Sequence, residues 1–586
     1  MPQNENNDYR LIGNNLFSLT YKEFYKSKVG PRKESLHVFV RYVEPEKINH
    51  NSINILEIGF GPGTNFFELL ETLQSKKNKK EINYFAFENK PIDEKVIKKY
   101  LYKLKFQKKN INIFLNSYAP VENGLAVINF FHLNVNLFFF HGDFLHFAQC
   151  LSLRIDYFFL DPFSPKVNKE AWSKKMFQNI KKFSYENSVI LTYSVAKNIQ
   201  KNLLSIDFKV DLKKGIGQKK YNLLATAVNQ NLFKQINNKK IVIIGAGISG
   251  ILCAYYLNSF GLEVTVIDSN SEIMSDASSV PIAMVRPYFS PKDIIYNQFL
   301  FSSYLFALNF YEHFKKTNLK SGIKKHHSIF IPNKNFKYGD FFERILLEKK
   351  FINFHTHELN GKKTFIFKKN FSIHTKKFKK IIFHNLEQKV SFQFNKEIKK
   401  VKRKGDFYKL FDKDGKIIKA DILIYTGGFK SSSIVINNLN LLKPSFGQQD
   451  YVQSFDNFKS PYLGEIYVNK INSKQFIIGT SYHDGISDDR FKENDSLMLQ
   501  EKIKQLFPGI DSQKNSSWCS TRSITPDRRA LFGQVDSNFY ISTGLGSIGF
   551  TISPIMAFLV AKKILGIDLF KLNQFRKIDF TRFVSN

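Results

Sequence analysis

Cysteine is scarce in this chain, and the few cysteines lie far apart. The 586 residues include only Cys150, Cys253 and Cys519, and no two of them form a CxxC pair. A disulfide framework and a zinc site are therefore not expected, and we predict that the protein holds no metal. The same scarcity favours a reducing compartment, and we expect a cytoplasmic protein.

Long hydrophobic runs are also lacking. The two most apolar stretches are residues 127–140, which contain His132, Asn134 and Asn136, and residues 545–565, which are interrupted by glycines and Pro554. Neither should span a bilayer, so we expect buried strands in the first, a core helix in the second and no membrane association. The first thirty residues lack the basic and apolar regions of a signal peptide, which argues against export.

Acidic residues are few for a chain of this size. There are 51 Asp and Glu residues against 87 Lys and Arg residues, which gives a net charge of +36. Such a surface would attract a polyanion such as RNA in a salt-dependent manner. Alternatively, AT-rich coding explains the abundance of Lys, Asn, Ile and Phe, and lysine runs such as residues 76–80 are then solvated loops. Charge alone leaves both explanations open.

The most informative features present are two glycine-rich turns, each of which follows an apolar strand. They lie within residues 55–63 and 241–250. A strand that leads through a glycine turn into a helix brings backbone and a helix N-terminus close to a ligand. Because 586 residues exceed what one core usually organises, we predict two cofactor-binding domains, over residues 1–228 and 239–586, joined by a polar linker at 229–238.

In the N-terminal half, apolar runs alternate with amphipathic segments, which predicts a largely parallel sheet covered by helices. Glu88 ends the second predicted strand, 25 residues after Gly63, where a carboxylate can accept hydrogen bonds from a ribose diol. Asp143 and Asp161 end two later apolar runs, so three acids should gather along one sheet edge and suit a cationic ligand with a ribose. Alternatively, each acid only caps the helix that follows it.

Several sequence blocks give this half a resemblance to a known family. Residues 57–66, residues 87–91 and residues 159–168 followed by Trp172 resemble the methyltransferase domain of the bifunctional tRNA 5-methylaminomethyl-2-thiouridine biosynthesis family, MnmC, and residues 24–27 and 34–39 are similar to its N-terminal segment. The resemblance implies a Rossmann-like domain that binds S-adenosylmethionine and methylates a primary amine. It assigns the cofactor to Gly59, Gly61, Gly63 and Glu88, with Asp143 near the adenine.

The methyl acceptor needs alignment and a neutral nitrogen, for which a nearby carboxylate suffices. Asp161 is our candidate for that carboxylate, with Phe163 and Pro165 as walls of the acceptor site. The chain departs from the family at Pro162, where glycine is expected, and at Ser164, where alanine is usual. Proline removes a backbone donor and fixes φ, so we expect a stiffer loop than in relatives.

The second glycine turn has the form GxGxxG. Gly245, Gly247 and Gly250 follow a four-residue β-branched strand and open an apolar helix, and Asp268 ends the next strand 18 residues after Gly250. This context predicts dinucleotide binding. A strand ending in small residues at 420–428, and a strand at 541–549 that turns into a helix at 554–565, favour FAD over NAD, because a helix N-terminus can stabilise reduced flavin. The alternative for the last segment is an ordinary βα turn.

This half resembles the D-amino-acid-oxidase-type FAD oxidoreductases, and specifically the second domain of the MnmC family. The resemblance lies in residues 522–527 with Gly533, residues 479–483, residues 447–448 and residues 544–549. It implies FAD bound by Gly245, Gly247, Gly250, Asp268, Gly544, Gly546 and Gly549. It also implies oxidation of carboxymethylaminomethyl-uridine at the tRNA wobble position to aminomethyl-uridine, which the first domain then methylates.

Arg522 is our candidate for binding the substrate carboxylate, because a guanidinium matches a carboxylate in a bidentate manner. Its alternative role is a structural ion pair, for instance with Asp527. Tyr482 and His483 are candidate pocket residues, although a lone Tyr or His beside a strand is more often part of the core.

Two departures concern the flavin segment. Where the family has an alanine-serine-glycine-asparagine run, residues 277–280 read Ala-Ser-Ser-Val, and Ala283 replaces a glycine. We expect these larger side chains to narrow the flavin approach.

The segments at about 300–400 and 435–515 carry alternating apolar patterns and predict an inserted substrate-binding sheet. Within them, residues 376–380 and 399–404 interleave basic side chains with apolar or aromatic ones, so contact with tRNA is one hypothesis and a solvated face is the other.

The sequence therefore predicts an α/β protein with an N-terminal Rossmann-like methyltransferase and a C-terminal FAD-binding dinucleotide fold with an inserted α+β substrate-binding domain. The leading hypothesis is a bifunctional tRNA-modifying enzyme that uses FAD and S-adenosylmethionine. One alternative is an FAD-dependent amino-acid or amine oxidase fused to a methyltransferase with another target. The other is a tRNA-binding protein that has lost one activity.

Overall fold

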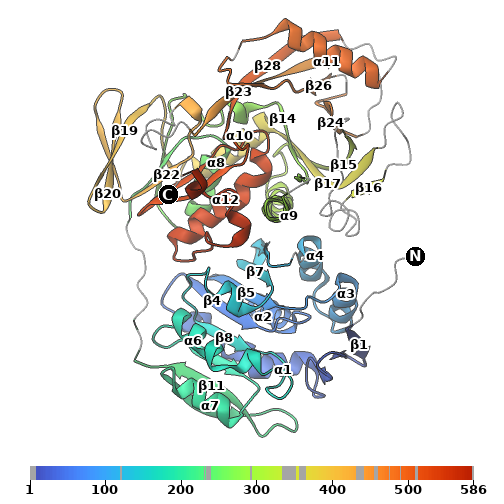
Figure 1. The fold of residues 1–586 in the computed structure, drawn as a ribbon, viewed down its shortest axis with the longest axis vertical. Helices are drawn as coiled ribbons and strands as arrows, with labels where there is room; N and C mark the ends of the chain where they lie inside the picture. The colour runs from blue at the N-terminus through green and yellow to red at the C-terminus, as the bar shows by residue number, and fades with distance from the viewer. Residues whose placement is uncertain are drawn as a thin grey trace. The chain divides into compact units, whose positions relative to one another are not determined.

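The computed structural model describes residues 8–118, 122–229, 231, 239–290, 293–332, 352–354, 364–430, 441–453, 460–473, 475–488, 490–507 and 513–583. The chain divides into two compact units, one of Met1–Gln235 with Gly566–Asn573 and the other of Ile236–Leu565 with Gln574–Asn586. Most of the predicted linker at 229–238 lies outside the described residues. Figure 1 labels some of the helices and strands of each unit.

The first unit is built on an eight-stranded sheet in the order β10-β11-β9-β8-β4-β5-β7-β6. The strands are β4 (Ser52–Ile58), β5 (Glu81–Glu88), β6 (Leu125–Phe130), β7 (Val135–His141), β8 (Tyr157–Leu160), β9 (Val189–Thr192), β10 (Phe208–Lys214) and β11 (Tyr221–Ala227). The five inner strands are parallel, and β6, β10 and β11 are antiparallel to their neighbours. The chain leaves β4 in one direction through β5 and returns to its other side at β8, so the carboxyl end of β4 is the switch point where ligands bind in such sheets.

Helices alternate with these strands as the sequence predicts. They are α1 (Pro31–Val38), α2 (Thr64–Ser75), α3 (Glu94–Lys103), α4 (Lys108–Ser117), α5 (Phe144–Phe147), α6 (Lys174–Phe183) and α7 (Lys197–Leu204). Side-chain caps start some of them: Asp93 accepts from Lys95 N before α3, and Ser173 accepts from Met176 N before α6. A small sheet of β1 (Tyr9–Ile12), β2 (Asn15–Ser18) and β3 (Glu23–Phe24) precedes them.

The apolar stretch at 127–140 forms most of the antiparallel pair β6 and β7, as expected for buried strands. Two of its asparagines are hydrogen-bonded within the sheet: Asn129 Nδ2 donates to Asn136 Oδ1 at 2.6 Å, and Asn136 Nδ2 donates to Glu81 Oε1 at 2.7 Å. Asn129 and Asn136 are both buried, so these bonds link polar side chains across neighbouring strands inside the sheet.

The second unit contains a six-stranded sheet in the order β18-β13-β12-β22-β30-β29. The strands are β12 (Ile241–Ile244), β13 (Val264–Ile267), β18 (Ser391–Gln393), β22 (Ile422–Tyr425), β29 (Leu531–Asp536) and β30 (Phe539–Thr543), of which only β29 is antiparallel. β12 leads through the GxGxxG turn into α8 (Ile248–Ser259), and β12 is flanked by β13 and β22. The predicted dinucleotide fold is confirmed.

A ten-stranded mixed sheet is inserted into this fold. It contains β14 (Ile282–Val285), β15 (Ile323–Ile331), β16 (Ile352–Phe354), β17 (Phe365–His374), β23 (Lys443–Gln453), β24 (Tyr462–Gly464), β25 (Tyr467–Lys470), β26 (Gln475–Gly479), β27 (His483–Asp484) and β28 (Gln513–Ile524). The helices α9 (Ile294–Thr317), α10 (Thr375–Leu386) and α11 (Glu493–Leu506) accompany it. A separate three-stranded sheet joins β19 (Ile398–Lys404), β20 (Phe407–Asp412) and β21 (Ile417–Ala420).

The apolar stretch at 545–565 forms most of the buried helix α12 (Gly549–Ile564). The helix begins five residues before the predicted start, so Pro554 lies inside it. Proline cannot donate to the carbonyl four residues earlier, and the hydroxyl of Tyr311 donates to that carbonyl, on Phe550, at 3.0 Å. Within the part of the chain that the structure describes, no helix is both long and apolar enough to cross a membrane.

Candidate active sites

The first site is a cavity of about 460 Å³ at the carboxyl end of β4. Gly59 and Gly61 line it, and Gly63 stands at the start of α2. Gly59 has φ +87°, and a Cβ there would lie 2.9 Å from the backbone of Asp161 and Pro162. Only glycine fits a turn with this close backbone approach, and the space beside it stays open for a ligand.

Glu88 and Asp143 both line this cavity. Glu88 Oε2 accepts from Gly61 N at 2.7 Å, and its Oε1 accepts from Lys90 N at 2.9 Å, so the carboxylate is fixed against the glycine turn. Burial raises the pKa of Glu88, while these backbone donors oppose that rise. Asp143 accepts from Leu145 N at 2.5 Å, so it caps α5 as well as facing the cavity.

Asp161 lies at the end of β8 and forms a buried ion pair with Lys26. Asn65 joins the pair, because its Nδ2 donates to Asp161 Oδ2 at 2.9 Å and its Oδ1 accepts from Lys26 Nζ at 2.8 Å. Asn65 Nδ2 also donates to Glu57 Oε1 at 2.6 Å, and the Tyr84 hydroxyl donates to Glu57 Oε2 at 2.7 Å. We call these five residues the Asp161 cluster.

The electrostatics of the Asp161 cluster follow from burial. Burial, and to a smaller extent the neighbouring Asp161, raise the pKa of Glu57 to about 8. Burial also raises the pKa of Asp161, whereas Lys26 lowers it. Near neutral pH Glu57 is therefore protonated, and the ion pair with Lys26 favours the ionised form of Asp161.

The loop after Asp161 is held from several sides. Phe163 stacks on Tyr21 with ring centroids 4.4 Å apart, and its carbonyl accepts from Trp172 Nε1 at 2.8 Å. Ser164, one of the departures from the family, donates from its hydroxyl to Glu23 Oε1 at 2.5 Å. Phe163 lines the cavity, whereas Pro165 is not among its lining residues.

The carbonyl of Pro162, the other departure, accepts from the Tyr193 hydroxyl at 2.8 Å. The proline therefore has a defined place in the loop, and Pro162 itself lines the cavity.

The second site is a cavity of about 530 Å³ beside the GxGxxG turn. Gly245 and Gly247 line it, and Gly250 packs behind it: a Cβ on Gly250 would lie 1.9 Å from the Gly245 carbonyl oxygen. Asp268 Oδ2 accepts from Ala246 N at 2.6 Å, which repeats the arrangement of Glu88 in the first site. Burial raises the pKa of Asp268.

The residues that line the second cavity fit FAD. Besides the GxGxxG turn, the lining includes Gly544, Gly546 and Gly549, the last of which begins α12. Two helix N-termini, an acid at the end of β13 and glycines without side chains match the pyrophosphate and ribose of a dinucleotide. By the same donor chemistry, the glycine turn and the acids of the first cavity fit S-adenosylmethionine.

The departures in the flavin segment have partners in the second unit. Ser279 Oγ accepts from Trp518 Nε1 at 3.1 Å, and the neighbouring Ser278 Oγ accepts from Ile248 N at 3.0 Å. Val280 and Ala283 line the cavity, and Ser279 is not among its lining residues.

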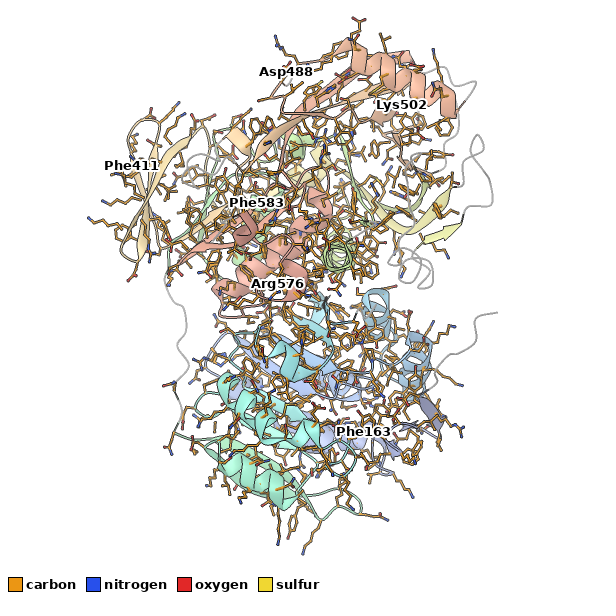
Figure 2. All side chains as sticks on the ribbon, in the orientation of Figure 1. Phe163, Phe411, Asp488, Lys502, Arg576 and Phe583 are labelled. Carbon is orange, nitrogen blue, oxygen red and sulfur yellow. The ribbon has the colours of Figure 1, made fainter. Side chains whose placement is uncertain are left out.

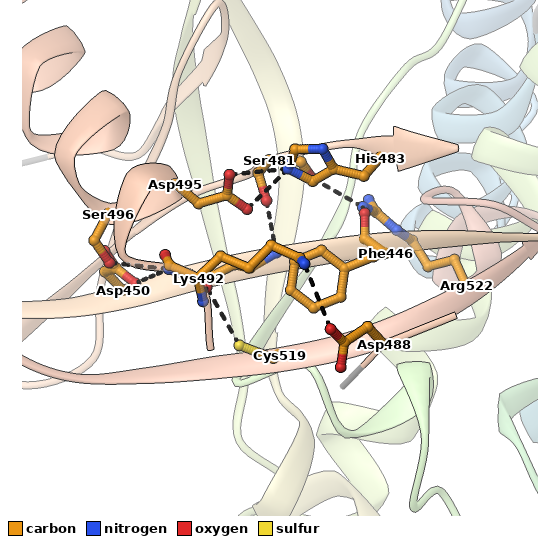
Figure 3. Close-up of polar contacts among 11 residues, drawn as sticks. Phe446, Asp450, Ser481, His483, Asp488, Lys492, Asp495, Ser496, Cys519 and Arg522 are labelled. Carbon is orange, nitrogen blue, oxygen red and sulfur yellow. Dashed lines mark hydrogen bonds and ion pairs between the residues drawn. The ribbon is translucent and has the colours of Figure 1, made fainter. Parts of the chain in front are cut away.

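Arg522 lies on β28 and lines the second cavity with 9% of its surface exposed. Its Nη2 donates to the carbonyls of Phe446 at 3.1 Å and Ser481 at 3.0 Å (Figure 3). Its guanidinium lies 4.2 Å from the ring centroid of Tyr482. Asp527 pairs with Arg582 at 2.9 Å, and among the described residues no carboxylate forms a salt bridge with Arg522. Burial lowers the pKa of Arg522, but a guanidinium stays charged.

Tyr482 lines the cavity, whereas His483 is not among its lining residues. His483 Nε2 contacts the carboxylate of Asp495 at 2.9 Å (Figure 3). Gln448 N donates to the side chain of Ser481, at Oγ, at 3.1 Å, so a hydrogen bond ties β23 to the residue whose carbonyl accepts from Arg522.

Sequence reasoning missed several residues of both sites. In the first they are Lys26, Asn65 and Glu57, although all three lie within blocks that resemble the family. In the second they include Arg286, whose guanidinium lies 3.9 Å from the ring centroid of Tyr288, and Gln449, whose buried Oε1 has no hydrogen-bond partner. Gln449 directly follows Gly447 and Gln448, which belong to the resemblance, and this position could have indicated Gln449 as a site residue.

No group of three or more His, Cys, Asp or Glu side chains that could hold a metal ion occurs in the described ranges.

Two family models match the chain. The model described as FAD dependent oxidoreductase matches residues 240–563, and the model described as S-adenosyl-L-methionine-dependent methyltransferase matches residues 105–228. Both cofactor classes expected from the motifs are thereby confirmed.

The chain is also similar to curated proteins of one name, "tRNA 5-methylaminomethyl-2-thiouridine biosynthesis bifunctional protein MnmC". The protein from Campylobacter jejuni subsp. doylei is 26% identical over 553 residues, which are 90% of this chain and 86% of that protein. The protein from Leptospira interrogans serovar Lai is 27% identical over 328 residues, which are 53% of this chain and 50% of that protein. Among solved structures, glycine oxidase from Geobacillus kaustophilus is 14% identical with a TM-score of 0.48, covering 56% of this chain and 94% of that chain. The resemblance inferred from the motifs is confirmed.

Proposed function

This chain belongs to the family of FAD-dependent oxidoreductases and carries a methyltransferase domain ahead of it, and from this premise we propose that it modifies the wobble uridine of tRNA in two successive reactions. The relatives named for tRNA 5-methylaminomethyl-2-thiouridine biosynthesis support this substrate, because the similarity extends through both domains. We assign residues 1–228 to the methyltransferase, 229–238 to a linker and 239–586 to the oxidoreductase. A tRNA substrate implies a cytoplasmic location.

The first reaction removes the carboxymethyl group from 5-carboxymethylaminomethyl-uridine or its 2-thio form. The observation that carries this proposal is the guanidinium of Arg522, which lines the same cavity as the flavin-binding glycines and forms no salt bridge with a carboxylate of the described residues. A secondary amine with a carboxylate two bonds from its nitrogen suits that charge. Tyr482 supports the guanidinium from one side, and the carbonyls of Phe446 and Ser481 fix its direction.

FAD, when bound, supplies the two-electron oxidation of the carbon–nitrogen bond, and addition of water then releases a two-carbon aldehyde acid and leaves the primary amine. The residues of this chain bind and orient the substrate. Arg522 holds the carboxylate so that the methylene carbon between carboxylate and nitrogen is the one that is oxidised.

The second reaction methylates the aminomethyl group in the first cavity. S-adenosylmethionine, when bound, supplies the methyl group. Asp161 lines that cavity and orients the amine, which must be neutral to act as a nucleophile. Phe163 and its stacking partner Tyr21 form an aromatic wall of the cavity for the uracil ring.

Mass spectrometry of wobble nucleosides tests this proposal. Hypomodified tRNA is incubated with the flavin-loaded full-length protein, with and without S-adenosylmethionine. We expect aminomethyl-uridine without the methyl donor and methylaminomethyl-uridine with it. Persistence of carboxymethylaminomethyl-uridine in both samples would rule out the oxidation, and turnover of free glycine instead of tRNA would favour the amino-acid oxidase alternative.

A further inference from the structure

The three-stranded sheet β19-β20-β21 has one face that packs on the second unit. Tyr408, Leu410 and Ala420 on that face belong to a buried hydrophobic cluster. Arg403, also on that face, pairs with Asp536 of β29 at 2.7 Å. The sheet is therefore anchored through this face.

The other face carries an ordered arrangement of basic and aromatic side chains. The register aligns Lys402 with Lys409 and Lys409 with Lys419, so three lysines stand directly opposite one another across the three strands. Two residues along each strand in one direction, the same face carries a row of Lys400, Phe411 and Ile417. Two residues along in the other direction, it carries Lys404 opposite Phe407. We call these eight side chains the lysine face.

The charge of the lysine face is largely uncompensated. Among the described residues, no salt bridge involves Lys400, Lys402, Lys404 or Lys409, and Lys419 has only Asp421 at 4.0 Å. Like charges directly opposite in a sheet are destabilising, and neighbouring strands lie only about 5 Å apart. A partner with closely spaced negative charges would remove that repulsion.

The aromatic residues distinguish this face from an ordinary solvated charge run. Phe407 and Phe411 are half-buried on the same side as the lysines, and Figure 2 labels Phe411 among the side chains of this sheet. Lys419 Nζ lies 4.3 Å from the ring centroid of Phe407, and Ile417 is 54% exposed. Proteins that bind single-stranded nucleic acid combine such basic surfaces with aromatic rings on which bases stack.

We propose that the lysine face of β19, β20 and β21 binds the RNA substrate, with phosphates on the row Lys402, Lys409 and Lys419 and unpaired bases on Phe407 and Phe411. The inference rests on the proposed function, in which tRNA is the substrate. The face itself carries no catalytic group, so it acts as a docking surface that raises the affinity for RNA outside the two cavities.

The test compares two charge-reversal variants of the flavin-loaded full-length protein. One is K402E/K409E/K419E, and its matched control is K76E/K77E/K79E just after α2, which changes the net charge by the same amount at exposed lysines. Fluorescence anisotropy with hypomodified tRNA measures Kd from low to high salt. For the lysine-face variant we expect affinity at least about tenfold weaker and a salt slope lower by about one unit per lysine, with little change in the control.

Further arms identify the contribution of the rings and check folding. Phe411→Leu keeps an apolar side chain and should weaken binding of a single-stranded RNA oligonucleotide about fivefold or more, since a stacked base contributes severalfold. The flavin spectrum and the melting temperature report whether each variant is folded. If the reversal variant does not fold, K402Q/K409Q/K419Q replaces it, with a smaller loss of affinity expected.

The outcomes separate the docking surface from the proposed function. Wild-type protein that neither binds nor modifies tRNA would contradict the proposed function. If the wild-type protein modifies tRNA and both reversal variants bind tRNA as tightly as the wild type does, only the RNA-binding role of the lysine face would be overturned. The proposal would also be overturned if the lysine-face reversal variant bound tRNA as the wild type does but no longer bound phosphatidylglycerol vesicles that the wild type binds. That result would identify the face as a membrane-surface site.

Discussion

Replacing Gly447 by alanine should displace the Arg522 guanidinium without changing the charge of the protein. A Cβ on Gly447 would lie 2.0 Å from Arg522 Nη2 and 2.7 Å from its Cζ. Those atoms are the far end of a flexible side chain, so the guanidinium moves rather than the backbone. The φ of Gly447 lies outside the left-handed region, so alanine causes no backbone strain, and the Ser481 carbonyl oxygen, 3.1 Å from the added Cβ, has to shift by only a few tenths of an ångström.

The expected loss follows from the bonds that hold the guanidinium. In the wild type, Nη2 donates to Phe446 O at 3.1 Å and to Ser481 O at 3.0 Å, and both bonds are lost when it moves. A displaced guanidinium can no longer meet the substrate carboxylate, and hydrogen bonds to charged groups contribute ~1.5–3 kcal/mol each. Loss of ~3 kcal/mol corresponds to a decrease in kcat/KM of about 150-fold.

The assay is the rate of aminomethyl-uridine formation from hypomodified tRNA by Gly447→Ala, by Arg522→Ala and by the double variant. We expect both single variants to lose oxidation, and the double variant to be no slower than Arg522→Ala, because both changes remove one interaction. The flavin spectrum and the methylation of tRNA that already carries aminomethyl-uridine serve as controls and should stay as in the wild type. A Gly447→Ala enzyme that oxidises at the wild-type rate, or losses that add in full, would refute the role given to Arg522.

Three other predictions concern the cofactor cradle and the Asp161 cluster. Gly250→Ala should abolish FAD binding, because its Cβ would lie 1.9 Å from the Gly245 carbonyl oxygen; a wild-type flavin absorbance would contradict this. Lys26→Met removes the cation that lowers the pKa of Asp161, so the acid limb of the methylation pH profile should move to higher pH, and an unmoved limb would argue against Asp161 as the group that titrates. Glu57 has a pKa raised from its ordinary value to about 8 in the folded state, so its contribution to stability is present at low pH and is lost as pH rises toward 8. Glutamine does not titrate, so the melting temperature of Glu57→Gln minus that of the wild type should increase as pH rises from 6 to 9, as measured by calorimetry. A difference between the two proteins that does not change with pH would contradict this.

The parallel cores and the cofactor cradles could be predicted because their signals are local. A strand, a glycine turn and an acid at the end of the next strand lie within about thirty residues, and Glu88 and Asp268 both accept from the backbone of their glycine turns. The departures at Ser164 and Ser279 could be seen in the sequence, but their partners, Glu23 and Trp518, depend on tertiary contacts.

The remaining features depend on contacts between distant segments. Lys26 and Asp161 are 135 residues apart in the chain, so no local pattern joins them. The start of α12 was predicted too late because Pro554 normally ends a helix, whereas Tyr311, far away in the chain, supplies the missing donor to Phe550. The pairing of His483 with Asp495 likewise depends on the packing of α11 beside β27.

The central claim is that two separate sites of one chain act in sequence on the same nucleoside, and the most direct measurement is the wobble nucleoside left by each single-site variant. With tRNA, FAD and S-adenosylmethionine present, Asp161→Asn should accumulate aminomethyl-uridine. Arg522→Ala should leave carboxymethylaminomethyl-uridine but still methylate tRNA supplied with aminomethyl-uridine. Loss of both reactions in either variant, or unchanged carboxymethylaminomethyl-uridine with Asp161→Asn, would contradict the account.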